Sequence, residues 1–243
     1  MPIDAARWTF AADGTPYSTL YDDVYHAAAG GLAQARHVFI QGNRLTERWA
    51  AGRSGTFTIF ETGFGIGLNF LATWQAWHAR KIEDDNADLH FVSVEKHPFR
   101  RDDLVRVLAP LAAAESSLTP AIDALTQQWP PLAVGAHRLR FDAERIKLTL
   151  LWGDALDWLA AQECDINNID AIYLDGFAPA KNPDLWSDAV LTPLTRRCRP
   201  CATLATWSVA GALRRRLQSL GWKTERRPGF AHKREMLTAI LPA

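Results

Sequence analysis

The chain has 243 residues, enough for one large α/β domain with a full core or for one domain with a small appendage. Apolar residues make up 48% of the chain and charged residues 22%, a composition that indicates a globular protein and excludes a disordered one. The sequence has no apolar run of membrane-spanning length, no basic-then-apolar secretion pattern and only three cysteines, so we expect a cytoplasmic protein.

Positive charge is concentrated near the C-terminus, although the formal net charge of the whole chain is zero. Residues 196–235 contain eleven Lys and Arg residues against two acids, so the preceding part of the chain is net acidic. Such a basic region is either a surface for a polyanion or a set of solvated helix faces, and composition alone favours neither.

The first 55 residues are a polar, glycine-punctuated lead-in, which we expect to pack as an N-terminal extension on a single globular domain of residues 56–243. Tyr17, Tyr21 and Tyr25 recur every four residues, a spacing that predicts one face of a helix. This stripe would either pack in the core or form a wall over an adenine or another base.

The segment 57–70 combines a buried strand, a glycine turn and a helix start. Its alternate glycines are Gly63, Gly65 and Gly67. Glycine permits a turn with positive φ and lets a ligand touch the backbone, while the helix start offers free N–H groups. A dinucleotide-binding fingerprint needs its third glycine at the position of Leu68, so the spacing disfavours that ligand.

An acidic residue, Glu61, closes the strand just before the glycine turn. A carboxylate there would repel a pyrophosphate, whereas it suits a cationic ligand with an amino-acid end. The pattern acid-x-G-x-G-x-G resembles motif I of class I S-adenosylmethionine (SAM) methyltransferases. The alternative is a tight β–α turn that binds no ligand.

Two further strands are predicted to lead into carboxylates. Residues 89–95 form a buried strand ending at Glu95, where doubly wound folds often hold ribose hydroxyls; a helix cap or surface acid is the alternative. A hairpin over residues 137–152 leads to Asp154. Asp154 could cap the next helix, accept from an adenine amino group, or do both.

Residues 169–183 contain a strand that runs to Asp175, followed by an irregular loop with one glycine and two prolines. An acid in that position, beside Phe177 and held by prolines, would face whatever the edge of the sheet binds.

The order of these elements predicts an α/β fold. After the loop we expect a helix, a fifth strand over residues 202–208, a helix over residues 211–220 and a C-terminal strand pair. The expected architecture is a Rossmann-like, seven-stranded, mostly parallel sheet with helices on both faces, an antiparallel C-terminal edge strand, an N-terminal extension and a small inserted hairpin.

The motif Cys198-Arg-Pro-Cys201 is a C-x-x-C at a predicted helix end, and only Cys164 remains as a third thiol. A zinc site needs a second ligand pair, and a thioredoxin-like motif should open a helix after a strand. We therefore expect neither metal binding nor redox activity.

Four stretches together resemble the methyltransferase half of the MnmC family, which completes 5-methylaminomethyl-2-thiouridine at the wobble position of tRNA. They are residues 37–43, 61–70, 174–183 and 229–236, and the run Asp-Gly-Phe-Ala-Pro-Ala-Lys-Asn-Pro is much more specific than the glycine motif. The resemblance extends from about Tyr17 to the C-terminus. Two positions depart from the family pattern: Gln34 stands near an expected glutamate, and Cys201 replaces a usual glycine.

The resemblance implies SAM-dependent N-methylation of the primary amine of 5-aminomethyl-(2-thio)uridine. It implies the anticodon stem-loop of tRNA as partner, SAM as cofactor, and no metal or membrane. In many bacteria this domain is fused to an FAD-dependent oxidoreductase that acts first, so the chain is either a stand-alone enzyme or the N-terminal half of a bifunctional one.

The strand ends, the glycine motif and the resemblance together indicate roles for individual residues. Asp175 would orient the amine and help to take its proton. The expected cofactor-binding residues are Glu61, Gly63, Gly65, Gly67, Asn69, Glu95, Asp154 and Asp175. The expected substrate-binding residues are Phe177, Pro179, Lys181, Asn182, Arg214, Arg215, Lys233 and Arg234, the first four shaping a uracil pocket and the last four holding phosphates.

Three other functions remain as alternatives. A SAM methyltransferase acting on a small molecule or a protein would use the same cofactor residues without needing the basic region. A non-catalytic RNA-binding module would keep the fold and lack SAM affinity. An NAD-dependent dehydrogenase is disfavoured by Leu68 and Glu61.

Overall fold

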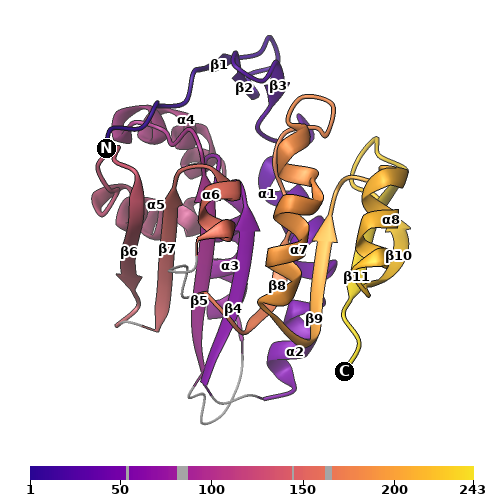
Figure 1. The fold of residues 1–243 in the computed structure, drawn as a ribbon. Helices are drawn as coiled ribbons and strands as arrows, with labels where there is room; N and C mark the ends of the chain where they lie inside the picture. The colour runs from indigo at the N-terminus through magenta and orange to yellow at the C-terminus, as the bar shows by residue number, and fades with distance from the viewer. Residues whose placement is uncertain (53–54, 81–86, 144, 162–165) are drawn as a thin grey trace.

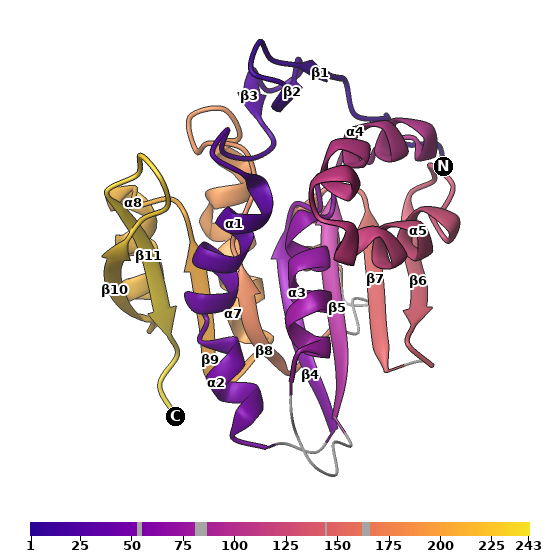
Figure 2. The same ribbon diagram turned by 180° about the vertical axis from the view of Figure 1, so that it is seen from behind.

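The computed structural model describes residues 1–52, 55–80, 87–143, 145–161 and 166–243. A central sheet separates two layers of helices, as Figures 1 and 2 show from opposite sides. Among the described residues, no helix is both long and apolar enough to cross a membrane.

Five parallel strands form the middle of the sheet. They are β4 (Gly55–Thr62), β5 (Ala87–Glu95), β7 (Ile146–Trp152), β8 (Ile169–Tyr173) and β9 (Cys198–Thr206). Most of their residues are buried, because helices cover both faces of a parallel sheet. The sheet order is β10-β11-β9-β8-β4-β5-β7-β6, so the chain reverses its winding direction between β4 and β8.

The sheet has eight strands rather than the seven predicted. The extra strand is β6 (Gly135–Phe141), which belongs to the expected inserted hairpin and pairs antiparallel with β7 along its whole length. Leu139 and Phe141 of β6 are buried, so the hairpin extends the core instead of projecting from it.

The prediction that the C-terminal strand lies at the edge was wrong in one respect. The hairpin of β10 (Lys223–Pro228) and β11 (Glu235–Ile240) does close that side of the sheet, but β11 is the inner strand, between β9 and β10. The side chains explain the order: β11 buries a run of four residues, whereas β10 is largely exposed and rich in charge, which suits an edge strand.

Helices from the two halves of the chain cover opposite faces (Figures 1 and 2). One face carries α1 (Gly31–Ala35), the π-helix η1 (Arg36–Gln41), α2 (Leu45–Ala50), α3 (Leu68–His78), α4 (Arg101–Ala114), the 3₁₀ turn η2 (Ser116–Leu118) and α5 (Thr119–Gln127). The other carries α6 (Ala155–Ala160), the 3₁₀ turn η3 (Pro183–Trp186), α7 (Asp188–Arg196) and α8 (Gly211–Ser219). Phe39, Leu45 and Trp49 of the N-terminal segment share one core with Phe57 and Ile59 of β4.

The tyrosine helix predicted in the N-terminal segment is absent. Residues 8–24 instead form a small antiparallel sheet of β1 (Trp8–Phe10), β2 (Pro16–Ser18) and β3 (Asp23–Val24), which lies above the main sheet in Figure 1. The chain reverses between β2 and β3 with Asp22 at a φ of 53°, which a continuous helix cannot contain. Tertiary pairing therefore overrides the four-residue spacing of the tyrosines.

Candidate active site

A cavity of about 470 Å³ opens at the carboxyl ends of the parallel strands, where the order of the sheet reverses. Open α/β sheets bind ligands at this place, and the volume is in the range of small-molecule sites. The polar residues that line the cavity come from strand ends, from the first turn of α3, from loops and from the N-terminal segment; they include Asp23, Asn69, Glu95, Asp154 and Asp175.

The glycine turn between β4 and α3 forms one wall of the cavity through Gly63 and Gly65. Gly67 is not among the described cavity-lining residues. It precedes α3 with a φ of 79°, and a Cβ there would lie 2.9 Å from the ring of Phe64. Gly67 is therefore required by the turn itself.

Glu95 and Asp154 lie at the ends of parallel strands, as the sequence predicted, and both line the cavity. Glu95 accepts hydrogen bonds from the backbone N–H of Gly65 at 2.9 Å and of His97 at 2.7 Å. It thereby fastens the end of β5 to the glycine turn.

Asp154 caps α6 by accepting from the N–H of Leu156 at 2.9 Å. Its other oxygen accepts from Lys96 at 2.6 Å. Burial raises the pKa of Asp154, but these hydrogen bonds outweigh it, and the pKa lies below its usual value. The capping role is confirmed, and the carboxylate stays ionised at the cavity wall.

Asp175 follows β8 and is held by three donors. Its Oδ1 accepts from the N–H of Gly176 at 2.8 Å and from Nε1 of Trp207 at 3.0 Å, and its Oδ2 accepts from Nδ2 of Asn69 at 2.8 Å. Burial raises the pKa of Asp175, and the donors and nearby Lys233 oppose that rise. The side chain is thus a well-ordered carboxylate that faces the cavity.

Glu61 lies behind this wall. It is fully buried, and the described residues that line the cavity do not include it. It accepts from Oγ of Ser93 at 2.6 Å and from Nδ2 of Asn69 at 2.8 Å. Burial raises the pKa of Glu61 to about 8, so its carboxyl group is largely protonated at neutral pH.

Aromatic side chains line the other side of the cavity. Tyr21 stacks on Phe177 with ring centres 4.5 Å apart, and Tyr25 packs edge-on against the same ring at 5.2 Å. Asp23 accepts from the N–H of Ala178 at 2.9 Å, which ties β3 to the loop that follows Asp175. The N-terminal segment therefore completes the cavity.

The predicted substrate residues divide into two groups. Phe177, Asn182 and Lys233 line the cavity. Lys233 was expected to hold a phosphate, but its Nζ lies 3.4 Å from the ring centre of Trp207, and burial lowers its pKa against the attraction of Asp175 and Asp23.

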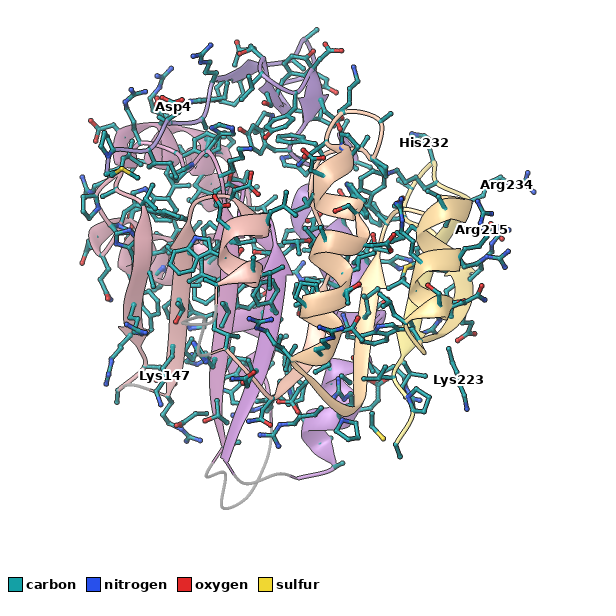
Figure 3. All side chains as sticks on the ribbon, in the orientation of Figure 1. Asp4, Lys147, Arg215, Lys223, His232 and Arg234 are labelled. Atoms are coloured by element: carbon teal, nitrogen blue, oxygen red, sulfur yellow. The ribbon has the colours of Figure 1, made fainter. Side chains whose placement is uncertain are left out.

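The second group does not line the cavity within the described structure: Pro179, Lys181, Arg214, Arg215 and Arg234. Lys181 pairs with Asp22 instead. Arg215 and Arg234 are exposed and point away from the protein at the C-terminal side in Figure 3.

Sequence reasoning missed two of the residues that line the cavity, Asp23 and Trp207, and singled out Tyr21 and Tyr25 only as members of a stripe that would pack in the core or form a wall over a base. Trp207 directly follows β9, so its place after a parallel strand was a usable indication. Nothing in the sequence indicated Asp23, because its contact with Ala178 joins residues that are 155 positions apart.

Within the described ranges, no group of three or more His, Cys, Asp or Glu side chains could hold a metal ion. The thiol of Cys198 donates to the carbonyl of Leu194 at 3.3 Å, and burial raises its pKa to about 12. The motif lies in β9 rather than at a helix end, and Cys164 is outside the described residues.

The profile of a family described as S-adenosyl-L-methionine-dependent methyltransferases matches residues 116–242. The chain belongs to this methyltransferase family. Its cofactor is therefore SAM. The residues present fit that molecule, because acids at the ends of three parallel strands surround one cavity and suit a cation that also carries ribose hydroxyls and amino groups.

The methyltransferase is also similar to longer curated proteins, and this bears out the resemblance to the MnmC family. It is 53% identical over 98% of its length to the tRNA 5-methylaminomethyl-2-thiouridine biosynthesis bifunctional protein MnmC of Azoarcus sp. strain BH72. The identity to the corresponding protein of Burkholderia thailandensis is 53% over 97% of the chain. The chain covers only 36% and 35% of these two relatives.

Among solved structures, MnmC2 of Aquifex aeolicus superimposes with a TM-score of 0.71 over 99% of this methyltransferase and 73% of that chain. The sequence identity is 22%, so the comparison supports the fold.

Proposed function

We propose that this methyltransferase transfers a methyl group from SAM to the primary amine of 5-aminomethyl-(2-thio)uridine at the wobble position of tRNA. The observation that carries the proposal is Asp175, a carboxylate held by three N–H donors at the wall of the cavity that the glycine turn also lines. The names of the bifunctional relatives supply the substrate.

The cofactor would lie along the glycine turn and the strand ends. Gly63, Gly65 and Asn69 would contact its amino-acid end, Glu95 its ribose hydroxyls, and Asp154 its adenine amino group. Each oxygen of Glu95 accepts one backbone N–H and keeps a second lone pair for a hydroxyl. When bound, SAM supplies a methyl group activated by a positively charged sulfur.

Asp175 would orient the amine. An alkylamine resembles the side chain of lysine, so it is mostly protonated at neutral pH and must lose a proton before it can attack. An ammonium N–H can donate to Asp175, which then holds the nitrogen in line and helps to accept the proton. A carboxylate with a raised pKa is a better acceptor than one in water.

The uracil ring would lie against Phe177, Tyr21 and Tyr25, with Asn182 at its edge. The wobble base must leave its stack to reach such a cavity, as RNA-modifying enzymes generally require. Arg214, Arg215 and Arg234 would hold phosphates outside the cavity, so binding should depend strongly on salt. A tRNA substrate would place the enzyme in the cytoplasm, with an FAD-dependent oxidoreductase, fused or separate, acting before it.

The test is incubation with labelled SAM and tRNA that carries 5-aminomethyl-uridine, followed by nucleoside analysis. The proposal expects label in 5-methylaminomethyl-uridine alone, and a loss of activity of about 100-fold in Asp175→Asn. The same tRNA lacking the aminomethyl group is the matched control and should stay unlabelled. Absence of label in the aminomethyl tRNA, with label in small amines or proteins, would favour the alternative methyltransferase function.

A further inference from the structure

Four side chains form a continuous buried chain of hydrogen bonds that ends at Asp175. Ser93 donates to Glu61 at 2.6 Å, Asn69 donates to Glu61 at 2.8 Å, and Asn69 also donates to Asp175 at 2.8 Å. Ser93 and Glu61 are direct neighbours in the register of β5 and β4. Asn69, in the first turn of α3, thus joins two carboxyl groups that lie on different strands.

The two carboxyl groups determine the orientation of the Asn69 amide. Both contacts come from Nδ2, whose two hydrogens are shared between Glu61 and Asp175. The flipped amide would direct its oxygen at the Asp175 carboxylate, which is unfavourable. The backbone of Asn69 is also held, because its carbonyl accepts from Oγ1 of Thr73 at 2.6 Å, and Thr73 in turn contacts the hydroxyl of Tyr173 at 2.9 Å.

This arrangement leaves one position for substrate on Asp175. A carboxylate has about four lone-pair sites, two on each oxygen. Gly176 and Trp207 use both sites of Oδ1, and Asn69 uses one site of Oδ2. The remaining lone pair of Oδ2 is the acceptor for an amine, and its direction depends on where Asn69 holds that oxygen.

Glu61 is placed to control Asn69 rather than to bind the cofactor. Its side chain is fully buried and separated from the cavity by Asn69, which does line the cavity. A largely protonated carboxyl group is also a poor partner for the cationic end of a ligand, and burial keeps Glu61 in that form.

We infer that Glu61 is a positioning residue for methyl transfer: through Asn69 it directs the free lone pair of Asp175 Oδ2 toward the substrate amine. The inference rests on the proposed role of Asp175. It assigns to Glu61 a function different from the cofactor contact expected from the motif.

The first test separates binding from catalysis with three substitutions. Glu61→Gln retains both contacts, because its carbonyl can accept from Asn69 and its amide can donate to Ser93. Glu61→Leu removes both contacts. Glu61→Asp keeps a carboxyl group at this buried position, but its side chain is shorter by one methylene and the group lies farther from Asn69. We expect kcat at saturating SAM to fall about 30- to 100-fold in Glu61→Leu and about 10-fold in Glu61→Asp, since a displacement near 1 Å can cost 100-fold.

The conservative variant should recover most of that loss, so Glu61→Gln should be at least about 10-fold faster than Glu61→Leu. The dissociation constant of S-adenosylhomocysteine, measured by calorimetry, should change by less than about threefold in Glu61→Gln. In Glu61→Leu and Glu61→Asp it should change by a smaller factor than kcat, because a displaced Asn69 also lies at the amino-acid end of the cofactor. A merely structural role would not separate kcat from cofactor affinity in this way.

The second test is a double-mutant cycle with Asp175→Asn. If Glu61 acts through Asp175, its substitution should cost little once Asp175 is gone, so the two losses should not multiply. Glu61→Asp closes the same cycle if Glu61→Leu does not fold. Asp170→Asn is the matched control, because Asp170 is a buried acid on β8 that accepts from the backbone N–H of Thr58 away from the cavity. Whatever factor Asp170→Asn takes from kcat alone, it should take the same factor in the Asp175→Asn background.

Two results would overturn the inference. One is a loss of S-adenosylhomocysteine affinity of tenfold or more in Glu61→Gln with kcat retained, which would make Glu61 a direct cofactor ligand. The other is a full multiplication of the Glu61 and Asp175 losses. Full methylation by Asp175→Asn would instead overturn the role of Asp175 itself, and absence of tRNA methylation by the unaltered enzyme would overturn the proposed function.

Discussion

Replacing Glu61 by Gln should change how the stability of this protein depends on pH. Glu61 is fully buried between β4 and β5, and burial raises its pKa from 4.5 to about 8. The folded state therefore holds the proton of Glu61 more tightly than the unfolded state does. Its contribution to stability is complete below the unfolded pKa and is lost progressively as the pH rises through the folded pKa.

The size of the effect follows from that shift. Between the two pKa values, each pH unit removes about 1.4 kcal/mol of the free energy of unfolding. Between pH 6 and pH 8 the unaltered protein should thus lose about 2 kcal/mol that the Gln variant, which does not titrate, retains. The Asn69 and Ser93 contacts remain available to Gln, so the comparison isolates the proton.

The assay is urea unfolding of both proteins at pH 6 and pH 8, with the free energies extrapolated to water. From pH 6 to pH 8, the free energy of unfolding of the variant should rise by about 2 kcal/mol relative to that of the unaltered protein. Glu47→Gln, at an exposed position of α2, controls for the loss of a glutamate charge. Parallel pH profiles for Glu61→Gln and the unaltered protein would refute the reasoning, because Glu61 would then be ionised in the folded state.

Three further predictions concern other residues. Trp207→Phe removes the N–H that Asp175 Oδ1 accepts, so kcat should fall about 10-fold with S-adenosylhomocysteine affinity kept; an unchanged kcat would contradict this. Cys201→Gly should raise the free energy of unfolding by about 1 kcal/mol in urea titrations, because Cys201 has a φ of 63°; a lower value would show that its side chain contributes packing. The association constant for tRNA should fall with salt, and a plot of its logarithm against the logarithm of the salt concentration should become shallower by about one unit of slope in Arg215→Ala and in Arg234→Ala. Arg140→Ala on β6 should leave that slope unchanged.

The parallel strands and the acids at their ends could be predicted from the sequence because their causes are local. A buried parallel strand needs a continuous apolar run, and a ligand-binding turn needs glycine, so β4, β5, β7 and β8 and the turn at Gly63 are visible in the residues themselves. Glu95, Asp154 and Asp175 follow from the same rule, since parallel strands place their carboxyl ends at one edge.

Long-range contacts decided what the sequence could not show. The spacing of Tyr17, Tyr21 and Tyr25 is helical, yet β-pairing and the stacking of Tyr21 on Phe177 determine the fold of that segment. The inner position of β11 depends on competition between two adjacent strands for the core.

By itself, the sequence determined the fold class, the cofactor and most of the acids around the cavity, because each rests on residues adjacent in the chain. Only the tertiary structure placed Glu61 behind Asn69 and Lys233 over the ring of Trp207. The physical reason is that burial and partners, not residue type, set the role of a charged side chain. Those partners lie on other strands and loops.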